Sequence, residues 1–198
     1  QYSMNTCFVH STYVGNPAFS AYRDFHDQYG RYDESVDQYE HRNGTLVCRG
    51  KNMGNGEMYS QTTGGALYEW VSMDIPEERT VEYISPGIGQ GTNCVILDDG
   101  SLMCWGYNYY GQVGDGTSYA TSGWGATKWS PVYVSLPAGR TAIAVDNGYQ
   151  HTCAILDNGV VKCWGKGTGG QLGDGSMTNS ATPVSVSLPT GRTAVALA

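Results

Sequence analysis

Two stretches of the chain carry apolar runs on either side of a short turn. In residues 94–104 and 153–163 an apolar run, an Asp-Asp-Gly or Asp-Asn-Gly turn and a second run follow one another. A three-residue loop with glycine last is typical of a β-hairpin closed by a type I turn and a glycine bulge. Centred on its turn, the later hairpin places Leu156 opposite Val160. The pattern predicts antiparallel strands and an all-β fold.

The same signals recur in the same order after each hairpin. Cys-Trp-Gly and a Gly-rich stretch lead through a polar loop to a Pro-Val strand (131–136 and 183–188), a proline turn and Gly-Arg-Thr. Short strands that recur about every 50 residues are the signature of propeller blades. We therefore expect three repeats: a divergent first repeat at 1–79 with an insertion at 10–44, a second at 80–139, and a third at 140–198.

The sequence HTCAILDNGVVKCWGKGTGGQLGDGS (151–176) resembles the regulator of chromosome condensation repeat in its secreted, cysteine-containing microbial form. Two repeats match this pattern well, whereas Arg49 of the first stands where the others have Trp. The resemblance implies β-propeller blades, usually seven with four strands each, so three blades form an incomplete ring. The family's best-known member is a nuclear exchange factor that binds chromatin, a role that an acidic chain with paired cysteines argues against.

The six cysteines fall into three pairs, of which Cys7 and Cys48 flank the insertion, while Cys94–Cys104 and Cys153–Cys163 flank the two hairpin turns. The chain has no Cys-x-x-Cys spacing of the kind that holds zinc. Directly opposed cysteines suit disulfides that staple each hairpin. Such pairing predicts an oxidising compartment, and hence a secreted protein.

Composition narrows the classes of partner. The net charge is −7, which disfavours binding to nucleic acid. No apolar run approaches the ~20 residues that span a bilayer, so we expect no membrane insertion. A first residue of Gln suits either a mature product after signal cleavage or a piece of a longer chain.

The two ends of the chain carry complementary parts of one repeat. Aligned on Gly-Arg-Thr, Ala198 matches Asp146; aligned on the cysteines, Gln1 matches Asn147. An unpaired edge strand is a template for another chain. We expect the two ends to form assembly strands between copies, through Tyr2, Asn5, Thr6, Phe8, Val9, Thr193, Ala194, Val195, Ala196 and Leu197.

The leading hypothesis is a secreted structural subunit that assembles head to tail by strand complementation into an extracellular filament or similar polymer. The partners are then other copies of the chain. The alternative is a piece of a larger secreted propeller that binds a protein or a glycan through its loops.

Several motifs have a simpler and a functional interpretation. Helical spacing of aromatic residues predicts a short helix at 18–29 within the insertion. The Gly-Asp-Gly turns at 114–116 and 173–175 lack the spaced carboxylates of a calcium site, and Trp105 and Trp164 suit packing between blades. Trp124 and Trp129, in the loop 117–130, are candidates for a surface contact, and Asn43 begins an N-glycosylation sequon.

No group of residues has the spacing of a catalytic site. Of the four histidines, His151 lies in a repeat strand beside Cys153, and the first repeat has Asn5 at the matching place. The serines lack nucleophile-elbow spacing. We expect no enzyme activity, no metal and no cofactor.

Overall fold

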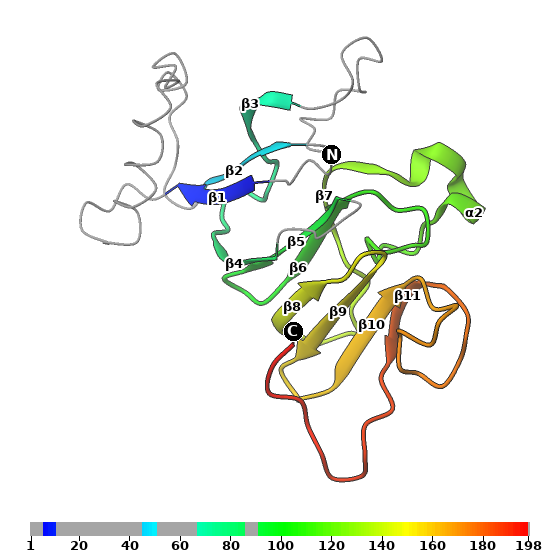
Figure 1. The fold of residues 1–198 in the computed structure, drawn as a ribbon. Helices are drawn as coiled ribbons and strands as arrows, with labels where there is room; N and C mark the ends of the chain where they lie inside the picture. The colour runs from blue at the N-terminus through cyan, green and yellow to red at the C-terminus, as the bar shows by residue number, and fades with distance from the viewer. Residues whose placement is uncertain (1–5, 11–44, 51–66, 86–90, 198) are drawn as a thin grey trace, which may run out of the picture.

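The computed structural model describes residues 6–10, 45–50, 67–85 and 91–197, which form an all-β protein. Three separate antiparallel sheets follow one another as an open series, as the propeller pattern predicts (Figure 1). The expected helix at 18–29 lies outside the described residues. Within the described part of the chain, no helix has the length and apolar character needed to cross a membrane.

Each sheet is built from strands that are consecutive in the chain. The N-terminal sheet has the order β1-β2-β3, the middle sheet β4-β5-β6-β7 and the C-terminal sheet β11-β10-β9-β8. Neighbouring strands are therefore joined by direct connections, which is the topology of a propeller blade. The bounds are β1 Thr6–His10, β2 Thr45–Gly50, β3 Leu67–Ser72, β4 Val81–Ser85, β5 Thr92–Leu97, β6 Leu102–Gly106, β7 Lys128–Tyr133, β8 Ala142–Asn147, β9 His151–Leu156, β10 Val161–Gly165 and β11 Ser180–Ser185.

The two hairpins have the register that the turns predict. Cys94 lies opposite Cys104, and Cys153 lies opposite Cys163. Gly100 and Gly159 close the turns with φ of 74° and 76°, in the left-handed region that favours glycine. The predicted turn with a glycine at its last position is confirmed in both hairpins.

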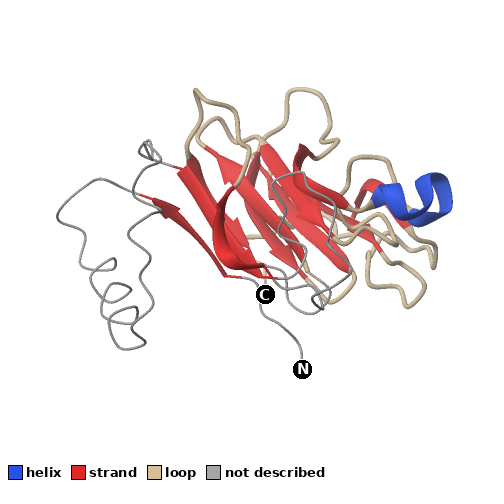
Figure 2. Ribbon diagram, turned by 90° about the horizontal axis from the view of Figure 1, so that it is seen from above, coloured by secondary structure: helices blue, strands red, loops and turns tan. Residues whose placement is uncertain are grey.

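The fourth strands of the middle and C-terminal sheets begin three residues earlier than the Pro-Val pattern predicts. A register shift after Cys104 brings Lys128 opposite Gly106, so pairing starts before the proline signal. Pro131 is tolerated because β7 is an edge strand, where a missing N–H costs little. The predicted loop 117–130 is correspondingly wrong in part, since it contains α2 (Tyr119–Ser122), η2 (Gly123–Ala126) and the start of β7. Figure 2 shows α2 outside the stacked sheets.

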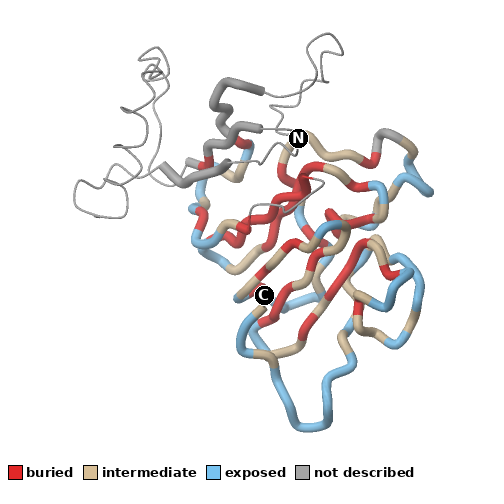
Figure 3. Tube along the Cα trace, viewed as in Figure 1, coloured by how far each residue is buried: buried red, intermediate tan, exposed pale blue. Residues whose placement is uncertain are grey.

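Apolar side chains fill the spaces between successive sheets. Buried residues are concentrated along the strands of the middle and C-terminal sheets (Figure 3). The N-terminal core joins the first two sheets through Leu46, Met73, Val81, Val95, Leu97, Met103 and Trp105. The middle core joins the second and third sheets through Cys94, Ile96, Leu102, Cys104, Val113, Val134, Ala142, Val145, Ala154 and Trp164. The C-terminal core, on the other face of the third sheet, has Ile155, Val161, Cys163 and Leu172.

Trp105 and Trp164 occupy the same place in their blades, and each is fully buried with 0% exposure. Trp105 lies in the N-terminal core and Trp164 in the middle core. Each indole therefore packs on the preceding blade, and the predicted role in packing between blades is confirmed.

Burial in the middle core predicts the cost of a cavity. Leu102 is 1% exposed, so Leu102→Ala should lower the free energy of unfolding by about 2–5 kcal/mol. Ile143 of β8 is 62% exposed, and Ile143→Ala should cost less than about 1 kcal/mol. Denaturant unfolding of the two variants measures this contrast, and equal losses would contradict the assignment of the core.

Candidate functional site

We call the contact between two successive blades a joint. The central hairpin of each of the last two blades is closed by a disulfide. Disulfides join Cys94 to Cys104 and Cys153 to Cys163, with S–S distances of 2.08 and 2.06 Å. Cys7 and Cys48 lie directly opposite each other in the ladder of β1 and β2. Their side chains lie outside the described part, so this third disulfide stays a prediction. Each staple lies within one blade, which leaves contact between blades to non-covalent interactions.

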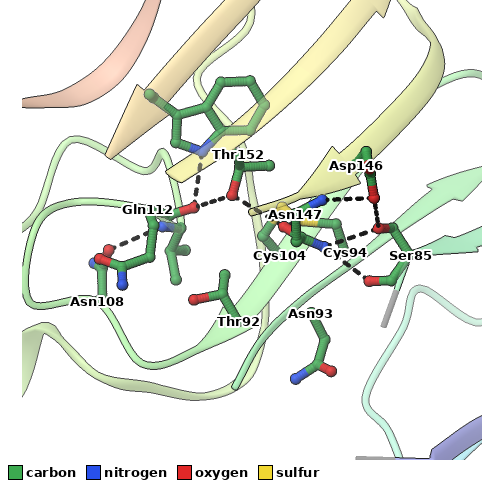
Figure 4. Close-up of a disulfide and its surroundings, with 12 residues drawn as sticks. Ser85, Thr92, Asn93, Cys94, Cys104, Asn108, Gln112, Asp146, Asn147 and Thr152 are labelled. Carbon is green, nitrogen blue, oxygen red and sulfur yellow. Dashed lines mark hydrogen bonds between the residues drawn. A yellow bond between two sulfur atoms is a disulfide. The ribbon is translucent and has the colours of Figure 1, made fainter. Parts of the chain in front are cut away.

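A buried polar network ties the first strands of neighbouring blades together (Figure 4). Asn147, at the end of β8, is 1% exposed. Its Nδ2 donates to the Ser85 carbonyl oxygen at 2.8 Å and lies 3.0 Å from Ser85 Oγ. Its Oδ1 accepts from Thr152 Oγ1 at 3.0 Å. One amide therefore joins β4 of the middle blade to β8 and β9 of the next.

The indole of Trp164 packs against the Gly111-Gln112 loop of the preceding blade. Trp164 Nε1 donates to the Gln112 carbonyl oxygen at 2.9 Å, in a buried contact. Gly114 borders this indole closely, because a Cβ at that position would lie 2.5 Å from Nε1. Any side chain at Gly114 would push the indole away, and its φ of +81° also favours glycine. The repeated glycine therefore serves the joint itself.

Residues 140–142, where β8 begins, bridge two hairpin turns. Ala142 N donates to the Gly100 carbonyl oxygen of the preceding blade at 2.9 Å. Asp157 N donates to the Thr141 carbonyl oxygen at 2.9 Å within the same blade. Arg140 pairs with Asp157 at 3.1 Å, but both side chains are more than a third exposed, so this ion pair adds little energy.

Residues 193–197 lie on the C-terminal blade in the way that β8 lies on the middle blade. A Cβ at Gly159 would meet Thr193 at 2.9 Å, just as one at Gly100 would meet Thr141 at 2.5 Å. Ala194 and Leu197 pack against the C-terminal core, as their repeat counterparts in β8 pack in the middle core. The segment belongs to no sheet of the described chain.

The N-terminal sheet shows the complementary feature. By the cysteine register, β1 corresponds to β5 and β9, the second strands of the other sheets. The other two sheets have a further strand beside this one, β4 and β8 respectively, whereas the described N-terminal sheet ends at β1. The backbone of β1 thus forms an edge where a first strand belongs.

The structure places the other predicted site residues only in part. Thr6, Phe8 and Val9 lie in β1, while Tyr2, Asn5 and Asn43 are outside the described residues, so the sequon stays a prediction. The expected surface contact through Trp124 and Trp129 is not established. Trp129 is half-buried within β7, and Trp124 lies in η2 with only its backbone described.

The Asp side chain of each Gly-Asp-Gly turn accepts a hydrogen bond from the backbone of its own turn. Asp115 Oδ1 accepts from Thr117 N at 3.0 Å, and Asp174 Oδ1 accepts from Ser176 N at 2.9 Å. Asp115 also pairs with Lys128 at 2.8 Å. Burial opposes ionisation of Asp115, but the hydrogen bonds from Lys128 and Thr117 outweigh it and hold its pKa below the ordinary 3.8. This turn is therefore anchored to β7.

In the part of the chain that the structure describes, the other titratable groups do not converge on a reaction centre. Burial lowers the pKa of His151 below 6.5, with Asp146 opposing the shift. Among the described residues no three His, Cys, Asp or Glu side chains come together as metal ligands would. The absence of enzyme activity and of cofactors stays a prediction.

A cluster of tyrosines in the second repeat lies outside the three apolar cores. The ring of Tyr109 stacks on Tyr119 at 4.7 Å and 11°, and on Tyr107 at 6.2 Å and 9°. Tyr110 meets Tyr109 edge-on at 4.9 Å. Burial and the neighbouring tyrosines raise the pKa of Tyr107 above its usual 10. We call Tyr107, Tyr109, Tyr110 and Tyr119 the tyrosine cluster.

Sequence reasoning missed both the polar joint and the tyrosine cluster. Ser85, Gln112 and Asn147 meet only in three dimensions, because Ser85 and Asn147 are far apart in the chain. The tyrosine cluster had a usable signal, since the third repeat has Lys166, Thr168 and Gly169 at the places of Tyr107, Tyr109 and Tyr110. A departure from an otherwise regular repeat marks a residue that blade building does not need.

Models of the regulator of chromosome condensation (RCC1) repeat match residues 99–155 and 158–198, and residues 141–171. The chain is 36% identical over 126 residues to the ultraviolet-B receptor UVR8 of Arabidopsis thaliana, covering 63% of this chain and 27% of that protein. It is 26% identical over 146 residues to the mitochondrial RCC1 domain-containing protein RUG3 of the same plant, covering 72% and 31%. The chain thus spans about a third or less of these relatives.

Solved structures show the same fold. Prp20p of Saccharomyces cerevisiae superposes with a TM-score of 0.59 at 19% identity, covering 74% of this chain and 35% of that one. Human WBSCR16 superposes with a TM-score of 0.56 at 20% identity, covering 74% and 36%. At this identity the likeness concerns the fold alone.

The buried amide of Asn147 predicts a specific loss of stability. Asn147→Ala removes the partner of Ser85 and Thr152 inside the joint, so it should lower the free energy of unfolding by about 1–3 kcal/mol. Ser187→Ala, at an exposed position, should change it by less than about 0.5 kcal/mol. Thermal or denaturant unfolding measures both, and a neutral Asn147→Ala would show that the joint does not depend on this amide.

The ion pair of Asp115 predicts a pH dependence. Its pKa is lower in the folded state than the ordinary 3.8, so the carboxylate stabilises the fold above pH ~4 and this contribution is lost as the pH falls through the folded pKa. Asp115→Asn should therefore flatten the acid limb of the stability profile below pH ~4. Unfolding midpoints between pH 7 and pH 2.5 test this, and an unchanged acid limb would contradict it.

Proposed function

Because the chain belongs to the regulator of chromosome condensation (RCC1) repeat family and forms blades of its propeller type, we propose that it is a structural subunit that assembles head to tail. Residues 193–198 of one copy add to the β1 edge of the next. The result is an extracellular polymer, in the simplest case a filament. The paired cysteines of the hairpins support a location outside the cell, where disulfides persist.

The observation that carries this proposal is the match between two incomplete elements. The described N-terminal sheet ends at β1, where the other sheets have a first strand. Residues 193–197 pack as a first strand does, yet pair with no described strand. Each element has what the other requires, and an edge strand with unpaired backbone groups readily accepts a further strand.

The repeat also supplies the expected register of the joint. In the C-terminal sheet, Ala144 lies opposite Ile155 and Val145 opposite Ala154, with a bulge at Ile143. Shifted by one repeat, Ala196 then lies opposite Val9, and Leu197 opposite Phe8. Val195 takes the bulge position of Ile143, which agrees with its 95% exposure.

Burial favours completion of the C-terminal core. The middle core has ten buried residues, among them Ala154 and Trp164 from the following blade, whereas the C-terminal core has four. A second copy docked in this register adds a complete sheet to that face. Apolar area removed from water contributes about 25 cal/mol per Å², so covering the face would drive association.

The contact is heterologous, because one copy offers its C-terminal segment and the other its β1 edge. Such contacts close into a ring or continue as a fibre, according to the rotation per copy. Two copies would give six blades, within the four to eight of known propellers, and three would exceed that range. The proposed filament and a closed dimer therefore predict clearly different particle sizes.

A second candidate function is a binding module within a larger propeller, whose remaining blades belong to the same polypeptide. Tyr109 and Tyr119 of the tyrosine cluster favour this candidate, because they are exposed and lie outside the apolar cores between blades. Prp20p of Saccharomyces cerevisiae, which shares this fold, has binding properties to Gsp1p and histones. A propeller of this fold can therefore serve as a binding platform.

Cysteine cross-linking tests the proposed joint. We mix two variants, one carrying Val9→Cys and the other Ala196→Cys, and expect a disulfide-linked dimer that appears only in the mixture. Directly opposed strand residues have Cβ atoms about 4.5–5.5 Å apart, and a small closing movement brings them to the roughly 3.5–4.5 Å that a disulfide requires. Val195→Cys is the matched control, since the bulge directs this neighbouring residue away from the partner strand and should give little product.

Size measurements separate the possible outcomes. Sedimentation and electron microscopy should show polymers of the full chain and monomers of a chain lacking residues 193–198. A closed dimer would retain the joint but rule out the filament. A monomeric full chain without cross-linked product would contradict strand complementation and leave the binding module.

A further inference from the structure

The tyrosine cluster borders a cavity of about 250 Å³ at the surface between the second and third repeats. None of the side chains that line this cavity carries a charge. They are Tyr109, Tyr110, Ser118, Tyr119, Ala120, Asn179 and Ala181. Clefts for drug-sized ligands occupy about 300–1,000 Å³, so this cavity suits one ring of a longer molecule.

Blade construction does not account for these tyrosines. Tyr109 and Tyr119 are 39% and 36% exposed, and both lie outside the three cores. The third repeat forms the same four-stranded blade with Thr168 in place of Tyr109, and its sequence is too short to hold a counterpart of α2 and η2. The aromatic surface is therefore an addition to one blade.

The rings are held in place before any ligand binds. The Tyr109 ring is nearly parallel to those of Tyr107 and Tyr119, and the Tyr110 ring meets it edge-on. Lys166 Nζ lies 5.3 Å from the centre of the Tyr110 ring. Side chains that are already ordered lose little conformational entropy on binding, which favours recognition of a ligand.

We propose that this cavity binds a neutral saccharide, one sugar ring of a glycan chain. Aromatic rings pack against the apolar C–H face of a sugar, while tyrosine, serine and asparagine groups can exchange hydrogen bonds with its hydroxyls. Uncharged walls and a net charge of −7 disfavour anionic ligands. The site lies within a single copy, so it does not depend on strand complementation.

A proline-rich peptide is the other ligand that tyrosine-lined surfaces commonly bind. Such peptides seat their prolines in grooves between aromatic side chains. Here the rings stack on each other at 4.7 and 6.2 Å, which leaves no slot of that kind between them. The geometry therefore favours the saccharide.

The test uses the full chain on an array of neutral oligosaccharides of hexoses, N-acetylhexosamines, pentoses and deoxyhexoses, followed by calorimetry with the best-bound sugar. Tyr109→Thr installs the residue of the third repeat, and Tyr119→Ala removes a second ring from a helical position where Ala is favoured. Each should weaken binding by about threefold to tenfold, as loss of an aromatic contact does.

Tyr133→Ser is the matched control, because Tyr133 is 53% exposed on β7, does not line the cavity and also takes the residue of the third repeat. It should bind as the parent chain does, and unchanged unfolding midpoints should show that all variants fold. Any of three results would overturn the proposal: no bound neutral sugar on the array, an equal loss in the control, or binding of a proline-rich peptide alone.

Discussion

Every blade of this protein needs the next one to cover its apolar face. Leu102 and Val113 of the middle blade are buried only because Ala142, Val145 and Trp164 of the following blade pack over them. A lone four-stranded sheet would expose this face to water, so stability comes from the contacts between sheets as much as from the sheets themselves. The order of blades along the chain follows from that requirement.

Covalent bonds stabilise each blade internally, whereas non-covalent contacts hold successive blades together. Disulfides hold the second and third strands of a blade together, while the contacts between blades use apolar packing and a buried hydrogen-bond network around Asn147. The disulfide within a blade reduces the conformational entropy of the unfolded chain. The buried polar network fixes the orientation of one blade relative to the next. The joints are therefore reversible, which suits either growth of a polymer or closure within a longer chain.

Departures from the repeat indicate where this chain differs from a plain scaffold. The segment between β6 and β7 is longer than its counterpart in the third repeat and contains the short helix α2 with Tyr119. Directly after β6 it has Tyr107 and Tyr109 where the third repeat has Lys166 and Thr168. Both blades nevertheless have the same strand order and the same disulfide. Surface loops of a repeat protein can change in this way because the cores between blades do not include them.

The sequence alone determined the local elements, because each depends on residues close together in the chain. The Asp-Asn-Gly turn sets the register that brings Cys153 opposite Cys163, and the repeat identifies the propeller type and the buried place of Trp164. The tertiary structure alone decided the polar joint and the cavity. Asn147 meets Ser85, and Tyr110 lines one cavity with Asn179, only when distant strands and loops are packed together. The start of β7 was also set in three dimensions, by a bulge that neighbouring strands impose and that side-chain alternation does not encode.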